Sequence, residues 1–358
     1  MDVALVHDYL TQRGGAERVV LSLVKAFPEA PLYTSLYEPD ATFPEFRNVD
    51  VRPLALNRIG ALRRRHRLAL PFLASAFSRL EVDADVVVCS SSGWAHGAHV
   101  TGRKVVYCYT PARWLYQSER YLATDDVVAR TALAALRRPL TDWDRRAAGS
   151  ADRYLAISTV VRDRIRAAYG IAADLLPPPH TIDADGPRMP LDAVETGFVL
   201  CVARLLPYKN VRAVADAFRL LPEQRLVVAG TGPELTSLKA DPSPNVHFAG
   251  AVTDEQLRWL YSNSIGVVSA SYEDFGLTPL EAAAFGKPAA VLRFGGFLDT
   301  VVEGQNGLFF ERPDPGAIAE ALNELVGRDW SERAIRAHAD SFSEEHFIAR
   351  IRKIATER

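Results

Sequence analysis

FVLCVARLLPYKNVRAVADAFRLL, residues 198–221, combines a short apolar run, a turn and an amphipathic stretch. The run Phe198–Ala203 is continuous in apolar residues, as in strands that are covered on both faces of a sheet. The stretch Val211–Leu221 instead has apolar residues at helical spacing. The segment therefore predicts a buried strand that leads directly into a helix.

The same alternation extends outward along the chain in both directions. It predicts an α/β fold of two Rossmann-like, doubly wound parallel-sheet domains. Other predicted strands are Val3–His7, Val86–Cys89, Lys104–Tyr109, Arg225–Gly230, Val246–Phe248, Ile265–Ser269 and Ala289–Leu292. Other predicted helices are Ala16–Phe27, Val160–Tyr169 and Ala317–Leu325.

The break between the domains is expected near Pro177-Pro178-Pro179, because the stretch from there to Gly197 has prolines, acids and no periodicity. A chain of 358 residues also exceeds the usual size of one domain. We predict an N-terminal domain over residues 1–180 and a C-terminal domain over residues 181–342. The sequence leaves open whether the last helix, residues 343–358, packs in the second domain or back on the first.

Composition excludes several classes of protein. The formal net charge of −2 gives no basic field for nucleic acid. The three cysteines form no Cys-x-x-Cys pair, which argues against a zinc or redox site. The N-terminus lacks the pattern of a secretory signal, and no apolar run reaches the length of a membrane span. We expect a cytoplasmic protein.

EDFGLTPLE, residues 273–281, is the strongest candidate for a ligand site. It follows a predicted strand and opens a helix, with Gly276 upstream, Thr278 as a possible cap and Pro279 in the first turn. Free N–H groups at such a helix start favour an anion such as a diphosphate. Glu273 and Glu281 can both face one pocket and accept sugar hydroxyls. The alternative is a capping box made by Thr278 and Glu281, with Glu273 solvated.

Arg204 and Lys209 bracket a proline-containing turn between a strand and a helix. Both can reach one anion at the carboxyl edge of the sheet; the alternative is two unrelated surface cations. The sequence Gly230-Thr231-Gly232 begins like a dinucleotide fingerprint, but Leu235 replaces its third glycine. That replacement argues against a dinucleotide-dependent oxidoreductase.

Together these residues resemble the donor site of family 4 retaining glycosyltransferases, which have the GT-B fold of two domains facing a cleft. Glu273 and Glu281 match the family's pair of glutamates with seven residues between them, and Arg204 and Lys209 match its cationic clamp. The order of several further segments is similar to the mannosyltransferase branch that builds O-antigen and related polysaccharides. These segments are VALVHDYLTQRGGAERVV, FPEAPLYT, SSSGWAHG, YTPARWLY and PPPHTID.

The resemblance implies a role for each matched side chain of the C-terminal domain. Arg204 and Lys209 would neutralise the leaving diphosphate as negative charge develops on it. Glu281 would hold the ribose, and Glu273 would face the donor hexose.

It also implies contacts from backbone groups and from the N-terminal domain. The N–H groups of Leu277 and Thr278 would contact phosphate. Gly14 and Gly15, in a Gly-Gly-x-Glu pattern, would let a helix start approach the donor. His96 occupies a position where relatives often carry a basic residue, and it would bind the donor or shuttle a proton; a structural histidine is the alternative.

The implied activity is retaining transfer of a hexose, with mannose from GDP-mannose favoured, to a glycan or lipid-linked acceptor. No cofactor or metal is expected, because Asp-x-Asp occurs three times and is unspecific here. The alternatives are a UDP-sugar donor, a nucleotide-sugar epimerase and a non-catalytic sugar-binding module.

The N-terminal domain is expected to bind the acceptor. Its most unusual feature is the basic run of residues 58–67, which an apolar stretch follows. Such a run can rest on an anionic membrane or grip a lipid pyrophosphate. The alternative is a solvated basic helix face.

Overall fold

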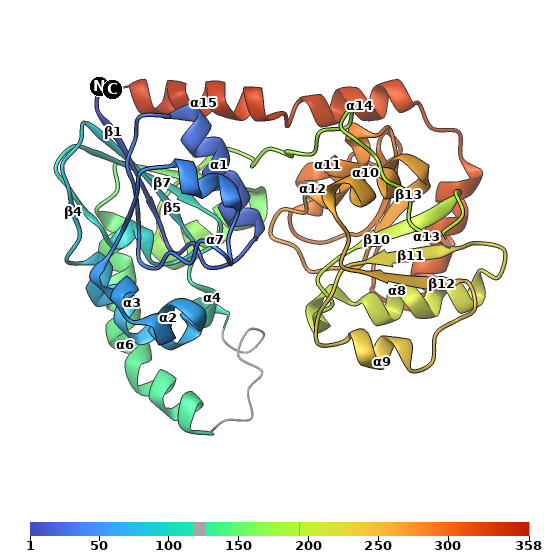
Figure 1. Ribbon diagram of the computed structural model, residues 1–358, viewed down its shortest axis with the longest axis horizontal. Coiled ribbons are helices and arrows are strands. Elements are labelled where there is room, and N and C mark those ends of the chain that lie inside the picture. Colours follow the sequence, from blue (N-terminus) through green and yellow to red (C-terminus); the bar gives the residue numbers. More distant parts are fainter. Residues whose placement is uncertain (118–126, 193, 358) are drawn as a thin grey trace. The chain divides into compact units, whose positions relative to one another are not determined.

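The computed structural model describes residues 1–117, 127–192 and 194–357, without the side chains of residues 67, 114 and 127–135. The chain forms two compact units (Figure 1). Unit 1 consists of Met1–Pro179 together with Glu344–Arg358, and unit 2 consists of His180–Ser343. The chain therefore enters unit 2 directly after the triproline and returns to unit 1 for its last helix.

Unit 1 is built on a parallel sheet in the order β3-β2-β1-β5-β7-β8-β9. Every residue of β1 and β5 is buried, because helices cover both faces of the sheet. The strands are β1 (Val3–His7), β2 (Leu32–Thr34), β3 (Val51–Pro53), β5 (Val86–Ser91), β7 (Arg103–Cys108), β8 (Arg153–Ala156) and β9 (Asp174–Leu175); β4 (Glu81–Val82) and β6 (His99–Val100) pair separately.

The helices of unit 1 include 3₁₀ turns as well as α-helices. The α-helices are α1 (Gly15–Ala26), α2 (Gly60–Arg64), α3 (Leu70–Phe77), α4 (Arg113–Tyr116), α6 (Val127–Gly149), α7 (Thr159–Tyr169) and α15 (Glu344–Thr356). The 3₁₀ turns are η1 (Pro44–Asn48), η2 (Ala55–Arg58), η3 (His66–Ala69) and η4 (Ala95–Gly97).

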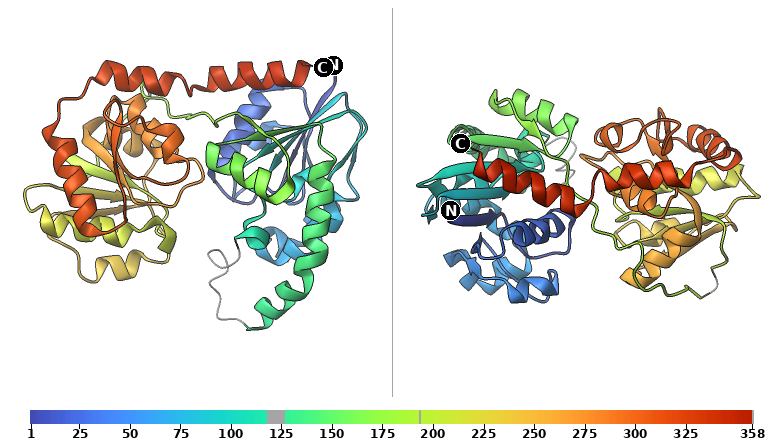
Figure 2. Two further views of the ribbon diagram at one scale, coloured as in Figure 1. Left: turned by 180° about the vertical axis from the view of Figure 1, so that it is seen from behind. Right: turned by 90° about the horizontal axis from the view of Figure 1, so that it is seen from above.

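The last helix, α15, packs on unit 1 (Figure 2). Glu344 accepts hydrogen bonds from Ser22 and Lys25 of α1, each at 2.6 Å. Phe347 is buried and meets the ring of Tyr107 edge-on, with 5.6 Å between the centroids. The helix thus completes the core of unit 1, from which it is separated in sequence by the whole of unit 2.

Unit 2 is built on a second parallel sheet, in the order β12-β11-β10-β13-β14-β15. Its strands are β10 (Phe198–Val202), β11 (Leu226–Ala229), β12 (Val246–Gly250), β13 (Ser264–Ser269), β14 (Ala289–Leu292) and β15 (Gly307–Phe310). Its helices are η5 (Pro207–Lys209), α8 (Val211–Ala217), η6 (Phe218–Leu220), α9 (Leu235–Lys239), α10 (Asp254–Asn263), α11 (Thr278–Ala284), α12 (Phe297–Thr300), α13 (Pro315–Gly327) and α14 (Glu332–Asp340).

Alternate residues of β10 enter two separate cores on the two faces of this sheet. Val199 and Cys201 join a cluster with the apolar faces of α8 and α13. Phe198 and Leu200 join a second cluster that contains Tyr261 of α10. Each fully buried side chain of this size contributes about 1.5–3 kcal/mol relative to exposure.

In both sheets the strand order reverses next to the first strand. In unit 2 the chain moves outward from β10 through β11 and β12, then crosses back to β13 on the other side. In unit 1 the corresponding reversal lies between β1 and β5. Loops diverge at the carboxyl ends of such strands, where doubly wound sheets bind their ligands.

Candidate functional site

The loop after β10 places Lys209 at the reversal point of the unit 2 sheet. Asn210 has a left-handed backbone (φ 52°), and its side-chain amide donates to the carbonyl of Ala270, just beyond β13, at 2.8 Å. The backbone N–H of Tyr272 in turn donates to the carbonyl of Tyr208 at 3.2 Å. The loops that follow the two central strands are therefore bonded directly to each other.

These bonds bring Lys209 and Glu273 together. Their ammonium and carboxylate groups form an ion pair, with the side chains 13% and 25% exposed. Lys209 also lies over the ring of Tyr208, 5.0 Å from its centroid. A largely buried charge pair fixes the position of both groups, and the remaining exposure leaves them accessible to a ligand.

Arg204 is the second predicted cation and belongs to the same loop. Its side chain is exposed, and within the described part of the chain its guanidinium has no hydrogen bond or ion pair. The neighbouring Leu205 is buried, and its N–H donates to the Thr231 carbonyl at 2.9 Å. The backbone next to Arg204 is thus held in place while the guanidinium extends into solvent.

The Glu273 loop is supported from behind by the loop after β14. The N–H of Gly296 donates to the carbonyl of Glu273 at 3.0 Å. A Cβ atom on Gly296 would overlap the backbone of Phe275, and one on Gly276 (φ 87°) would come within 2.5 Å of the Phe297 ring. Both glycines are required for this close approach, which places Glu273 on a rigid support.

Glu281 does not make the capping box that the sequence permits. Helix α11 begins at Thr278 with Leu277 as its N-cap, and no side chain caps it. The expected capping by Thr278 is therefore wrong, because Leu277 already has right-handed helical dihedral angles (φ −73°, ψ −31°) and Thr278 lies inside the helix. Instead, Glu281 accepts a hydrogen bond of 2.7 Å from the hydroxyl of Tyr261.

The two glycines after β11 have a structural explanation. A Cβ atom on Gly230 would overlap the carbonyl of Ala203, and one on Gly232 would overlap the carbonyl of Leu205. The pair lets the loop after β11 approach the loop after β10. A close backbone contact thus accounts for the partial fingerprint.

In unit 1, Gly14 and Gly15 form the start of α1. A Cβ atom on Gly14 would overlap Oε2 of Glu17, so this glycine gives space to the Glu17 carboxylate. Glu17 is buried, and its Oε1 accepts from the Gln12 amide at 3.0 Å. Burial raises the pKa of Glu17 to about 7. The Gly-Gly-x-Glu pattern therefore has an internal packing role here.

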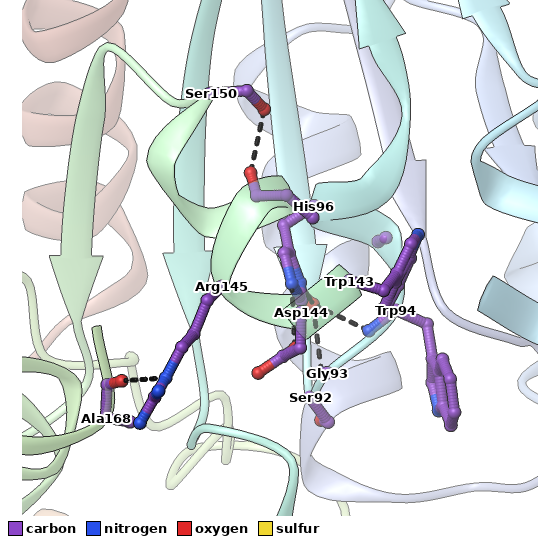
Figure 3. Close-up of polar contacts among 12 residues, drawn as sticks. Ser92, Gly93, Trp94, His96, Trp143, Asp144, Arg145, Ser150 and Ala168 are labelled. Carbon is purple, nitrogen blue, oxygen red and sulfur yellow. Dashed lines mark hydrogen bonds and ion pairs between the residues drawn. The ribbon is translucent and has the colours of Figure 1, made fainter. Parts of the chain in front are cut away.

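His96 has the contacts of a structural histidine. Its side chain is 2% exposed, and Nε2 lies 3.0 Å from Oδ1 of Asp144, which is fully buried. Its other nitrogen, Nδ1, lies 3.0 Å from the Ser91 hydroxyl. Figure 3 shows His96 beside Asp144 and Trp143 of α6. Both ring nitrogens thus have polar neighbours inside unit 1, and the donor or proton-shuttle role of His96 stays a prediction beside the structural alternative.

Sequence reasoning missed Asp8, which follows β1 at the reversal point of unit 1. Its carboxylate accepts from the N–H groups of Ser92 at 2.6 Å and Ala95 at 2.7 Å, so it shapes the turn after β5. Burial raises the pKa of Asp8 to about 6. The position of an acid directly after a buried strand was the available signal.

Two family models match the chain, one over most of each unit. Residues 13–182 match the model described as Glycosyltransferase Family 4, and residues 191–341 match the model described as Glycosyl transferases group 1.

Curated relatives carry related names. The GDP-mannose-dependent alpha-(1-6)-phosphatidylinositol monomannoside mannosyltransferase of Mycolicibacterium smegmatis is 28% identical over an alignment of 226 residues, and the match covers 56% of this chain and 56% of the relative. The D-inositol 3-phosphate glycosyltransferase 1 of Catenulispora acidiphila is 29% identical over an alignment of 238 residues, and the match again covers 56% of each chain. The chain thus spans about half the length of the curated relatives it matches.

Solved structures match nearly the whole chain at low identity. HepE of Anabaena in complex with UDP-glucose has a TM-score of 0.71 at 17% identity, covering 99% of both chains. Sucrose-phosphate synthase of Thermosynechococcus elongatus has a TM-score of 0.72 at 18% identity, covering 99% of this chain and 98% of that one. These similarities and the two parallel sheets show the predicted GT-B fold, and the chain belongs to the family 4 glycosyltransferases.

Proposed function

We propose that the chain transfers a hexose from a nucleotide-diphosphate sugar, whose diphosphate binds at the loops after β10 and β13. The observation that carries this proposal is the Lys209–Glu273 ion pair, held at the reversal point of the sheet on the same loop as the exposed Arg204. Cleavage of the anomeric C–O bond puts negative charge on the departing diphosphate. Two cations on a fixed backbone stabilise that charge as it develops.

The two carboxylates have different roles in this proposal. Glu273, held in place by its ion pair with Lys209, accepts hydroxyl groups of the donor hexose. Glu281 accepts ribose hydroxyls through the carboxylate oxygen that the Tyr261 hydroxyl does not occupy. The N–H groups of Leu277 and Thr278 precede the first helical hydrogen bonds of α11 and are the proposed phosphate donors.

The reaction proposed is retaining and needs no metal. The acceptor hydroxyl attacks on the side of the leaving group, and the departing phosphate takes its proton. Arg204 and Lys209 supply the positive charge that a divalent ion would otherwise provide. Gly14 and Gly15 remain proposed donor contacts from unit 1.

GDP-mannose is the proposed donor, and a glycan or a lipid-linked sugar is the proposed acceptor. The M. smegmatis relative is named as GDP-mannose-dependent. A UDP-sugar is the second candidate, because HepE of Anabaena was solved with UDP-glucose. A nucleotide-sugar epimerase differs from both in that it turns over the donor without an acceptor.

A thermal-shift panel of GDP, UDP and ADP tests the donor assignment. A nucleotide at 100 times its dissociation constant stabilises the folded state by about 2.7 kcal/mol. We expect the largest rise in melting temperature with GDP. No shift with either GDP or UDP would refute the assignment. Donor turnover in the absence of any acceptor would favour the epimerase.

We further propose that unit 1 contacts an anionic membrane through residues 58–72. Ile59, Leu68 and Phe72 are each just over half exposed, and they lie in or beside α2, η3 and α3. Arg64 and Arg65 are exposed in the same segment, and residues 51–80 contain no aspartate or glutamate. Arg63 is paired with Glu38, but in the part of the chain that is described Arg64 and Arg65 have no ion pair. Apolar side chains beside such arginines suit an acidic lipid surface, at about 1 kcal/mol per basic residue.

Sedimentation with vesicles tests this contact. We expect binding to vesicles rich in phosphatidylserine and little binding to neutral phosphatidylcholine. Phe72→Ser should weaken the binding, whereas Leu298→Ser, at an equally exposed position of unit 2, should not. Equal binding by both variants would remove residues 58–72 from the contact. Within the described residues, no helix has both the length and the apolar character needed to cross a bilayer.

A further inference from the structure

Lys104 is a buried cation whose ammonium has only neutral hydrogen-bond acceptors among the described residues. It is the second residue of β7 and only 4% exposed. Its ammonium donates to the carbonyl of His96 at 3.2 Å and to the hydroxyl of Ser150 at 2.8 Å, both of which are neutral acceptors. In the described ranges the Lys104 ammonium forms no ion pair. The carboxylate of the nearby Asp152 accepts a hydrogen bond from the backbone N–H of Lys104 instead, at 2.7 Å. One of the three ammonium donors therefore remains for another partner.

Buried charges in proteins are normally paired, because transfer of an isolated ammonium out of water is costly. Burial accordingly lowers the pKa of Lys104. Its two neutral acceptors satisfy hydrogen bonds but carry no charge, and the exposed Asp152 carboxylate offsets the effect of burial only in part. An anion from solution would balance the charge of the ammonium.

A cavity of about 470 Å³ lies directly beside Lys104. It is lined by the end of α6 and by the segment that enters β7. Among the described residues, no aspartate or glutamate lines the cavity. The polar side chains of its lining are cationic or neutral, and they are Ser78, His99, Lys104, Trp143, Arg146 and Ser150.

Arg146 supplies a second cation to this cavity. Its side chain is exposed, and the described part of the chain offers it no ion pair or hydrogen bond. The preceding residue, Arg145, takes a different direction: its guanidinium donates to the carbonyl of Ala168 at 3.2 Å, as Figure 3 shows. Of these two adjacent arginines, Arg146 alone lines the cavity.

The cavity lies away from the carboxyl edge of the unit 1 sheet. Lys104 pairs with Val87 near the start of β5, whereas Asp8 and the turn it shapes follow the other ends of β1 and β5. Ligands of doubly wound sheets normally bind at the carboxyl edge. The cavity is also separate from the donor site, which is proposed on unit 2.

We propose that this cavity is a second binding site that takes a small phosphate-bearing molecule between Lys104 and Arg146. The ammonium donates its remaining N–H to the phosphate, and the guanidinium binds it through paired N–H groups. The Ser78 hydroxyl, whose oxygen accepts from the Trp143 indole, donates a further hydrogen bond. The volume lies in the range typical of small-molecule sites and exceeds the needs of a single phosphate ion, so it has space for an organic group as well.

Calorimetric titration of the full chain with inorganic phosphate and with glucose 6-phosphate tests this site, with ionic strength held constant by chloride. We expect both anions to bind the wild type and the double variant Arg204→Ala/Lys209→Ala alike. Tighter binding of glucose 6-phosphate indicates an organic phosphate ligand, and equal binding indicates recognition of phosphate itself; either supports the site. Absence of binding to the wild type would overturn it.

Variants within the cavity locate the bound anion. Arg146→Gln, at an exposed position that tolerates substitution, should weaken binding at least tenfold, as should Lys104→Met. Arg145→Gln is the matched control and should bind as the wild type does. Unchanged binding in Arg146→Gln overturns the proposal. Loss of binding in the Arg204→Ala/Lys209→Ala variant also overturns it, because that result would place the anion in the donor site. Failure of the donor assignment would leave these expectations unaltered.

Discussion

Glu281→Ala separates the proposed ribose contact from a purely structural role. In the wild type, the carboxylate accepts a 2.7 Å hydrogen bond from the hydroxyl of the buried Tyr261. The variant removes that hydrogen bond, which costs about 0.5–1.5 kcal/mol of unfolding free energy. If Glu281 also holds the ribose, loss of a charged hydrogen bond should cost a further 1.5–3 kcal/mol of binding, or roughly 10–100-fold in affinity for GDP.

Tyr261→Phe is the matched control, because it removes the same internal hydrogen bond and keeps the carboxylate. We expect it to lose about 0.5–1.5 kcal/mol of stability with nearly unchanged affinity. Stability is measured by urea unfolding, and affinity by calorimetry at a temperature where all variants are folded. The reasoning is refuted if Glu281→Ala binds GDP as the wild type does, or if Tyr261→Phe loses as much affinity.

Three other substitutions test separate parts of the structure. Lys209→Met should lower kcat roughly 100–1000-fold by removing charge stabilisation of the leaving group, whereas Lys239→Met, an exposed lysine of α9, should leave kcat unchanged in the same steady-state assay. His96→Ala removes one neighbour of the buried Asp144 carboxylate, which keeps the 2.8 Å hydrogen bond from the Tyr116 hydroxyl, and should cost about 1–3 kcal/mol in urea unfolding; a large loss of turnover in a fully stable variant would instead support the predicted donor or proton-shuttle role. Because the pKa of Glu17 rises from 4.5 unfolded to about 7 folded, its contribution to stability is full below pH 4.5 and is lost as the pH rises through 7. Glu17→Gln should therefore raise the melting temperature at pH 8 relative to wild type more than at pH 5, and an equal change at both values would show that the carboxyl is not buried.

Most strands that could be predicted from sequence are valine-rich ones inside each sheet, and the edge strand β12 was predicted as well. All the predicted strands exist, because continuous apolar runs such as β5 are buried on both faces. The strands that escaped prediction are short or carry charge, such as β8 with Arg153 and β9 with Asp174. Their place in the sheet depends on pairing with a neighbour, which the local pattern does not record.

The sequence predicts which site residues lie together when they share one loop. It predicts this less well when the residues come from different elements that meet only through packing. Arg204 and Lys209 flank one turn, and the adjacency of β10 and β13 then brings Lys209 to Glu273. The partner of Glu281 was not predictable, because Tyr261 belongs to another helix and reaches it only through the packed core. The same holds for His96, whose partner Asp144 is distant in sequence.

The most direct test compares the affinities of GDP and guanosine for the wild type and for Arg204→Ala/Lys209→Ala by calorimetry. If the two cations hold the diphosphate, the wild type should bind GDP far more tightly than guanosine, and the double variant should lose most of that difference while still binding the nucleoside. A double variant that retains the full preference for GDP would contradict the account.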